Sequence, residues 1–215
     1  MRHRIFIAIN LPEDVKKQLA DYEKKWPTLP VRWVRGDNLH ITLVFLGYLN
    51  DEELLEVIKI VQEVAAKNLS FSINLNKILY GPPKKFPPRM VWVEGEESQE
   101  LANLQKDLEN SLYSSPLKGI KDSNLPATLP QERAPGEIRP YSPHITLGRI
   151  KTWEFRRIEP EERPSVSEEI SLSFPVESIE VMESQLKRGG PEYTILDSAP
   201  LAESKNPKFQ NPNSK

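Results

Sequence analysis

The 215-residue sequence contains no cysteine. That absence excludes disulfide bonds, thiolate metal ligands and cysteine nucleophiles, and it is consistent with a reducing compartment. No stretch approaches the ~20 consecutive apolar residues that a membrane-spanning helix needs. The apolar run near the N-terminus covers only Ile5 to Ile9, which is too short for a signal peptide and indicates a strand. We therefore expect a cytoplasmic protein that binds no membrane.

An excess of charge of one sign is also lacking, because the chain has 29 Lys and Arg residues and 31 Asp and Glu residues, so that the formal net charge is −2. A protein that follows a long nucleic-acid backbone usually carries a clear basic excess. Any nucleic-acid contact should therefore be short, such as one end or a few nucleotides. The sequence also has no glycine-rich phosphate loop of the P-loop or dinucleotide-binding type. We expect no cofactor.

Strand-like and helix-like segments alternate along the chain, which is typical of an α+β protein. Helix-capping patterns at Pro12, Asn50 and Ser98 predict helices that extend to about residues 25, 64 and 113. We expect residues 1–200 to form one bilobal domain, with the proline-rich stretch 114–140 as a long inserted loop and 201–215 as a disordered tail. Alternating, β-branched and aromatic residues predict strands at 4–10, 31–34, 39–46, 71–80, 90–93, 144–150, 178–186 and 192–197.

Only three histidines occur, and two of them begin the same tetrapeptide, His-Ile-Thr-Leu, at 40–43 and again at 144–147. Both tetrapeptides lie in predicted strands, where residues i and i+2 share one face. The Ile and Leu residues would anchor each strand in a core. His40 and Thr42, like His144 and Thr146, would then face a groove. If the two halves of the chain face each other, two imidazoles and two hydroxyls converge on one cleft.

This set of side chains suits the hydrolysis of a cyclic phosphodiester. The reference pKa of histidine is about 6.5, so one imidazole can take a proton from water while another protonates the leaving oxygen. Threonine hydroxyls can hydrogen-bond the non-bridging oxygens, where negative charge builds up. Such a reaction requires no metal ion.

A structural role and a zinc site are the two competing roles for the histidines. A single histidine in a strand is usually structural, and that remains the interpretation of His3. For the pair, ordinary residue frequencies give a chance on the order of one in a thousand that two of three histidines share the following Ile-Thr-Leu. A zinc site would normally need a third ligand, and threonine is a poor one.

The sequence around these motifs resembles the two-histidine (2H) phosphoesterases, and among them the LigT-like RNA 2′,3′-cyclic phosphodiesterases, also called 2′-5′ RNA ligases. The resemblance implies a bilobal, pseudo-symmetric α+β fold with two antiparallel sheets around a central cleft and helices outside. It covers roughly residues 3–200 and rests on RIFIAINLP (4–12), VRWVRGDNLHITLVFLG (31–47), RMVWVEG (89–95) and YSPHITLGR (141–149).

The resemblance also implies a substrate and a role for each motif residue. The substrate would be an RNA end or a nucleotide with a 2′,3′-cyclic phosphate, the product would be a 2′-phosphate, and 2′-5′ RNA ligation would be the reverse reaction. His40 would act as general acid on the departing 3′-oxygen, and His144 as general base on water. Thr42 and Thr146 would hold the phosphate.

Three further residues are candidates for substrate binding. By the same resemblance, Phe45 would lie near the base and Arg149 would contact the phosphate or nucleotide, while Tyr141 would line the cleft or merely pack. Strict alternation places Phe45 and Arg149 on the core face, so a β-bulge or a strand end is needed to turn them round. Gly148 could permit such a turn before Arg149, and core packing remains the alternative for Phe45.

Other functions stay open at this point. The same site could serve 2′-5′-linked oligonucleotides or another cyclic nucleotide, or the chain could be a non-catalytic module that binds RNA ends or nucleotides. A pure binder has no need for two titrating groups, which argues against the last possibility. We expect a monomer that binds no metal. If the 114–140 loop covers the cleft, short substrates would be favoured over structured RNA.

Overall fold

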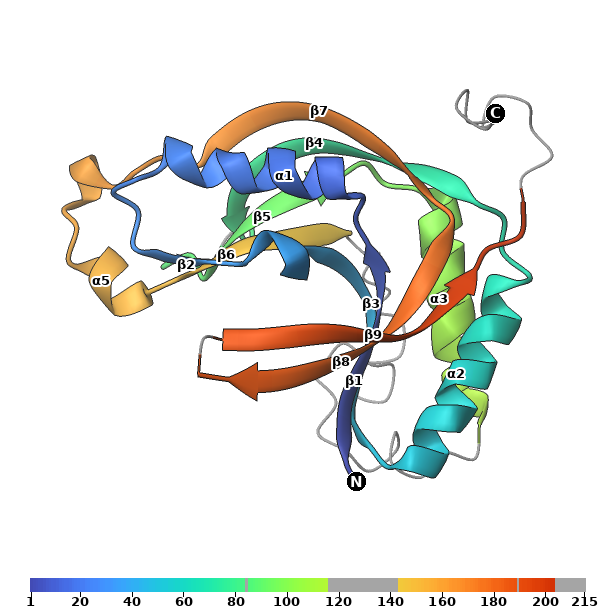
Figure 1. The fold of residues 1–215 in the computed structure, drawn as a ribbon. Helices are drawn as coiled ribbons and strands as arrows, with labels where there is room; N and C mark the ends of the chain where they lie inside the picture. Colours follow the sequence, from blue (N-terminus) through green and yellow to red (C-terminus); the bar gives the residue numbers. More distant parts are fainter. Residues whose placement is uncertain (84, 116–142, 189, 204–215) are drawn as a thin grey trace, which may run out of the picture.

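The computed structural model describes residues 1–83, 85–115, 143–188 and 190–203 (Figure 1). Within these ranges the strands form one nine-stranded sheet in the order β7-β4-β5-β6-β3-β1-β8-β9, with β2 paired to β6 beside this path. Neighbouring strands are antiparallel. Their bounds are β1 His3–Asn10, β2 Val31–Trp33, β3 His40–Leu49, β4 Phe71–Gly81, β5 Met90–Gly95, β6 His144–Ile150, β7 Ser167–Val176, β8 Ser178–Lys187 and β9 Gly190–Pro200.

The sheet consists of two halves that meet at a single residue pair, Ile41 of β3 opposite Ile145 of β6. One half contains β3, β1, β8 and β9, and the other contains β6, β5, β4, β7 and β2. Figure 1 shows the β8–β9 hairpin of the first half running beneath β2 and β6 of the second. The predicted α+β class is confirmed. The two separate sheets that we expected around the cleft are instead halves of one hydrogen-bonded sheet.

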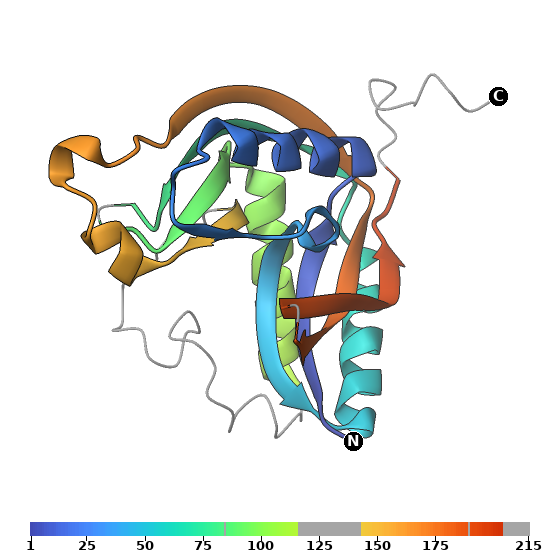
Figure 2. The same ribbon diagram turned by 60° about the vertical axis from the view of Figure 1, so that its left-hand side comes forward.

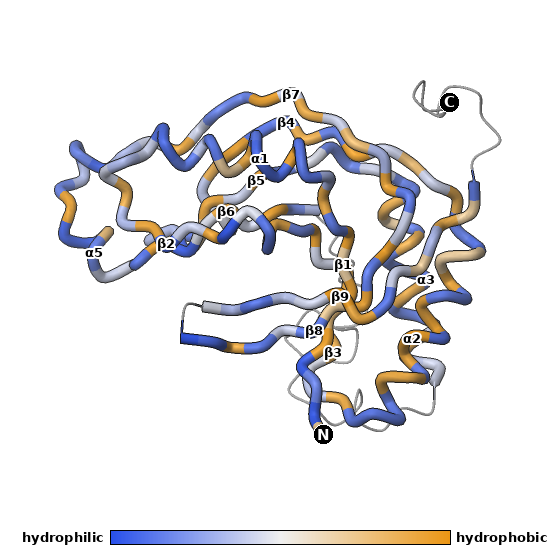
Figure 3. The backbone as a smooth tube through the Cα atoms, viewed as in Figure 1, coloured by the Kyte–Doolittle hydropathy of each residue, from blue (hydrophilic) through white to orange (hydrophobic). Residues whose placement is uncertain are grey.

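The longer helices lie outside the strands, as expected (Figures 1 and 2). α2 (Asp51–Ala65) packs beside α3 (Gln99–Ser114), and α2 contacts β8 and β9 while α3 contacts β3. α1 (Glu13–Asp21) continues into the 3-10 turn η1 (Tyr22–Lys25) and contacts η2 (Gly36–Asn38), the turn just before β3. Hydrophobic residues recur along α2 and α3 with the helical period, so one side of each helix covers the core (Figure 3).

Local sequence signals place the helix starts correctly. Asn50 and Glu53 form the expected capping box of α2, with both reciprocal hydrogen bonds at 2.9 Å. The Ser98 side chain caps α3 by accepting from the Leu101 amide. Two elements were not predicted, β7 and the short helix α5 (Thr152–Arg156). Its apolar residues Ile170, Leu172, Phe174 and Val176 do alternate with polar or exposed ones, so the strand pattern is present in the sequence and was overlooked.

The prediction placed the start of the tail, residue 201, too early in the chain. Leu201 is buried, and its amide donates to the carbonyl of Glu177. Ala202 forms a parallel bridge with Leu69, so the fold continues through these positions. Residues 204–215, Tyr141 and most of the 114–140 stretch lie outside the described residues. No helix in the described part of the chain is long and apolar enough to cross a membrane.

His3 links three elements through two carboxylates, and this arrangement predicts a pH-dependent stability. Its Nδ1 lies 2.8 Å from Glu183 of β8 and its Nε2 lies 2.8 Å from Asp51 at the start of α2. The hydrogen bond to Glu183, followed by that to Asp51, raises the pKa of His3 above its ordinary value of 6.5. Stabilisation by the protonated ring is therefore complete below pH 6.5 and is lost as the pH rises through the higher folded-state pKa.

We expect the difference in thermal midpoint between the wild type and His3→Gln to be largest at about pH 5.5 and to shrink toward about pH 8.5. The measurement is a pair of melting curves at each pH. A difference that stays constant across this range would contradict the assignment.

Candidate active site

The two His-Ile-Thr-Leu segments meet at the junction between the halves of the sheet. An antiparallel register through Ile41 and Ile145 sets His40 beside Thr146 and Thr42 beside His144. Both isoleucines are buried in the main core, so the His and Thr side chains share the opposite face, where they are partly exposed. The two histidines are diagonal neighbours, a relation that in a regular pair corresponds to roughly 7–8 Å.

His40 is held by hydrogen bonds on both ring nitrogens. Nδ1 donates to the Asn38 carbonyl at 2.7 Å, and Nε2 lies 2.9 Å from the Thr42 hydroxyl. Burial lowers the pKa of His40 below its ordinary value, although the bond to Asn38 opposes this effect. The charges of His144 and Lys16 lower the pKa further. His40 and His144 are thus close enough for each to feel the protonation state of the other.

The wall beside His40 is aromatic. Phe6 lies 5.0 Å from the His40 ring, centroid to centroid, and Tyr193 meets the same ring edge-on at 5.2 Å. Phe6 belongs to a small buried cluster with Ala8 and Met182, separate from the main core, and Tyr193 packs against it. Neither Phe6 nor Tyr193 was predicted from the sequence to belong to the site. Alternation within the first predicted strand does put Phe6 on the face opposite Ile5 and Ile7, but nothing local shows that this face borders His40.

His144 has a different neighbour. The Trp92 ring of β5 stacks on its imidazole with a centroid distance of 3.9 Å and an interplanar angle of 23°. Trp92 is 9% exposed, and its buried Nε1 has no hydrogen-bond partner among the described residues. The other side of the indole lies against Gly81, where an added Cβ would come within 2.1 Å of the ring. Trp92, which we expected to be a core residue, therefore also positions a site histidine.

A β-bulge turns Phe45 toward the site. Consecutive residues of β1 pair with Thr42 and then with Val44, so Leu43 is an extra residue in β3. Leu43 and Val44 are both buried, and Phe45 consequently emerges on the face of His40 with 48% of its surface exposed. Its ring lies 6.1 Å from that of Phe6. The core-packing alternative for Phe45 is therefore wrong.

The second motif contains the same irregularity. Consecutive residues of β5 pair with Thr146 and Gly148, so Leu147 is the extra residue in β6. Leu147, Gly148 and Ile150 are buried, whereas Arg149 is exposed on the face of His144 and Thr146. Each motif thus places a third side chain on the site face five residues after its histidine. The structure brings together every predicted site residue except Tyr141, which it does not describe.

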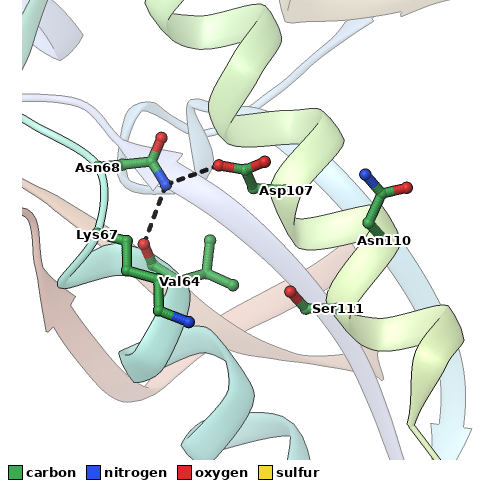
Figure 4. Close-up of a pocket in the computed structure, with 6 residues that line it drawn as sticks. All are labelled: Val64, Lys67, Asn68, Asp107, Asn110 and Ser111. Carbon is green, nitrogen blue, oxygen red and sulfur yellow. Dashed lines mark hydrogen bonds between the residues drawn. The ribbon is translucent and has the colours of Figure 1, made fainter.

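No group of three or more His, Cys, Asp or Glu residues with metal-binding geometry is found in the described ranges. A cavity of about 210 Å³ between α2 and α3 is lined by none of the site residues (Figure 4). Asn68 and Asp107 hydrogen-bond to each other across it. The cavity is therefore separate from the sheet face that carries the two His-Ile-Thr-Leu motifs.

Known proteins are similar to this chain over most of its length. The family model described as LigT like Phosphoesterase matches residues 9–92. The RNA 2′,3′-cyclic phosphodiesterase of Thermus thermophilus is 30% identical over 207 residues, which cover 92% of this chain and 90% of that protein. The chain belongs to the LigT-like phosphoesterase family. The RNA 2′,3′-cyclic phosphodiesterase of Methanocaldococcus jannaschii is 26% identical and shares 90% of this chain and 98% of its own length.

Two solved structures have the same fold over nearly the whole chain. The crystal structure of TT0787 from Thermus thermophilus matches with a TM-score of 0.73 and 28% identity, over 93% of this chain and 98% of that one. E. coli LigT in complex with 3′-AMP matches with a TM-score of 0.69 and 25% identity, over 94% and 99% of the two chains. The bilobal fold expected from the sequence is therefore the fold of the LigT-like family.

The contact of Gly81 with the Trp92 indole predicts that replacing Gly81 by a residue with a side chain lowers the stability of the protein. An alanine there forces the indole to move, and overpacking of this kind costs about 1–3 kcal/mol of stability. Gly36→Ala is the matched control, because its nearest neighbour would lie at 3.9 Å. Urea unfolding should show a clear loss for Gly81→Ala and little change for Gly36→Ala. Equal stability of the two variants would mean that the indole does not depend on Gly81.

Proposed function

We propose that this protein hydrolyses 2′,3′-cyclic phosphodiesters at RNA ends or on nucleotides to 2′-phosphomonoesters. The observation that carries the proposal is the register at Ile41 and Ile145, which gathers two imidazoles and two hydroxyls on one face. Relatives that share about nine-tenths of the chain are named RNA 2′,3′-cyclic phosphodiesterases. A LigT structure in complex with 3′-AMP supports a nucleotide as the bound group.

In the proposed reaction, water attacks phosphorus on the side opposite the 3′-oxygen. His144 takes a proton from this water as the new phosphorus–oxygen bond forms. The bond from phosphorus to the 3′-oxygen breaks, and His40 gives its proton to that oxygen. The products are a 3′-hydroxyl and a 2′-phosphate. His40 is then neutral and His144 protonated, and exchange with solvent restores both.

One contact of His40 supports its proposed role as the acid. The Asn38 carbonyl accepts from Nδ1, which leaves Nε2 as the nitrogen that faces Thr42 and the open side of the sheet. That carbonyl also stabilises the protonated ring. Thr42 and Thr146 would bind the non-bridging oxygens, where charge develops in the transition state. Phe45 would contact the base, and Arg149 the phosphate or nucleotide.

Substitution of either histidine tests the reaction directly. We expect His40→Ala and His144→Ala each to lower kcat on a 2′,3′-cyclic nucleotide by about a hundred-fold or more, because each removes one proton-transfer step. His3→Ala is the matched control, since His3 is bound to Glu183 and Asp51 away from the site. Wild-type activity should persist in excess chelator. If the wild type binds the nucleotide but does not hydrolyse it, the protein is a binding module and the proposed enzymatic function is wrong.

The proposal also predicts how His40 gains its proton. Burial lowers the pKa of His40 in the free protein, so the ring is largely neutral at neutral pH. A bound phosphate places negative charge next to Nε2, which should raise the pKa of His40 and protonate the acid when substrate arrives.

Proton NMR can follow this change, because the chain has only three histidines. In the free protein the His40 ring should titrate below the ordinary histidine value and His3 above it. A nucleoside 2′-phosphate, the expected product, should move the His40 midpoint upward and leave that of His3 unchanged. If the His40 midpoint does not rise, the acid must be sought elsewhere.

A further inference from the structure

Two arginines lie side by side next to the proposed reaction centre. Arg32 of β2 is directly opposite Arg149 of β6 in an antiparallel pair, so their side chains leave the sheet on the same side. Both are exposed. The neighbours of Arg32 in β2, Val31 and Trp33, pack against the main core. Arg32 therefore points to the opposite face, which it shares with Arg149 and the two histidines.

The sheet holds these like charges close together. Like charges directly opposite each other on neighbouring strands are destabilising. Gly148 leaves the space in which the Val31 and Trp33 side chains pack, because a Cβ on Gly148 would lie 2.3 Å from Cγ1 of Val31 and 2.9 Å from Cε3 of Trp33. No carboxylate in the described ranges forms an ion pair with Arg149.

Arg32 also lies against the other half of the sheet. Its guanidinium lies against Gly190 at the start of β9, where an added Cβ would come within 2.7 Å of Nη2. Close by, the Asn38 side chain donates to the Pro191 carbonyl at 2.8 Å. The start of β9 thus lies beside the Arg32 guanidinium at the junction of the two halves and limits the space in which this side chain can move.

We propose that Arg32 and Arg149 bind a second phosphate, the one attached to the 5′-oxygen of the terminal nucleotide. Arg149 follows Thr146 by three residues, which is roughly 10 Å of strand at about 3.3 Å per residue. The pair is therefore displaced from the cyclic phosphate by a distance that a long arginine side chain can partly cover. Guanidinium groups bind phosphate oxygens with two parallel hydrogen bonds, which favours arginine over lysine at such a site.

This inference rests on the proposed function, because it takes the cyclic phosphate to lie between His40 and His144. It narrows the substrate class. A substrate with a phosphate on its 5′-oxygen should be preferred over a cyclic mononucleoside phosphate. In an RNA strand this group is the last internucleotide linkage, so the favoured substrate is an oligoribonucleotide of at least two nucleotides. A contact with one additional phosphate also agrees with the net charge of −2, which does not favour a long basic track.

The experiment compares three substrates: a nucleoside 2′,3′-cyclic phosphate, the same compound with a 5′-phosphate, and a dinucleotide with a cyclic end. Arg32→Gln should lower kcat/KM for the dinucleotide roughly ten-fold, as expected for loss of a charged hydrogen bond, and change the value for the first substrate by less than about two-fold. Arg32→Lys should restore only part of the loss. Lys106→Gln, on α3, removes the same charge far from the site and should have no effect.

The outcomes separate the possible meanings. A loss with the dinucleotide alone assigns the site to the RNA linkage, whereas an equal loss with the 5′-phosphorylated mononucleotide assigns it to the phosphate group itself. Equal losses on all three substrates, or no loss on any, would overturn the proposal. If the wild type turns over none of them, the proposed function fails. Titration of a dinucleotide with a 2′-phosphate end against wild type and Arg32→Gln then still tests Arg32, and equal affinities would reject it.

Discussion

The backbone pairing of Ile41 with Ile145 is the contact on which the site depends. Both side chains are almost completely buried, and they form the only strand pairing between the two halves of the described sheet. Side chains alternate between the faces of a strand, so a slip of one residue would turn His and Thr into the core and Ile and Leu outward. Burial of the isoleucines therefore fixes the register. A shifted register would expose these two isoleucines to water, and the free-energy cost of that exposure keeps the histidines in their present arrangement.

The same β-bulge follows the threonine in both motifs, and it gives two similar strands different functions. The extra residues are Leu43 and Leu147. After each of them, the alternation of core-facing and site-facing side chains is shifted by one residue. In the first half this brings out Phe45, an apolar ring, and in the second it brings out Arg149, a cation. A pseudo-symmetric scaffold thus provides one side suited to a base and another suited to a phosphate.

The sequence predicted the local features of the fold well, because short-range chemistry determines them. Asn50 and Glu53 mark a helix start by themselves, and the repeated tetrapeptide identifies its own strand faces. The order of the strands depends on contacts between residues far apart in the chain, so neither the continuous sheet nor the place of Tyr193 beside His40 could be found. Phe45 shows the same limit on a smaller scale. Alternation gave the wrong face because the bulge is set by pairing with β1, which leaves no mark in the sequence of β3.

The proposed reaction needs unlike protonation states in the two copies of the motif, and the neighbours of the two histidines differ. His40 lies beside Phe6 and Tyr193 with its Nδ1 bound to a carbonyl, whereas His144 lies flat against Trp92. Because the charge of His144 lowers the pKa of His40, protonation of one ring opposes protonation of the other. Such a pair favours a state with one proton over a state with two. One imidazolium beside one imidazole is also the state that acid–base catalysis at a phosphodiester requires, so the closeness imposed by the Ile41–Ile145 pair contributes to the chemistry as well as to the geometry.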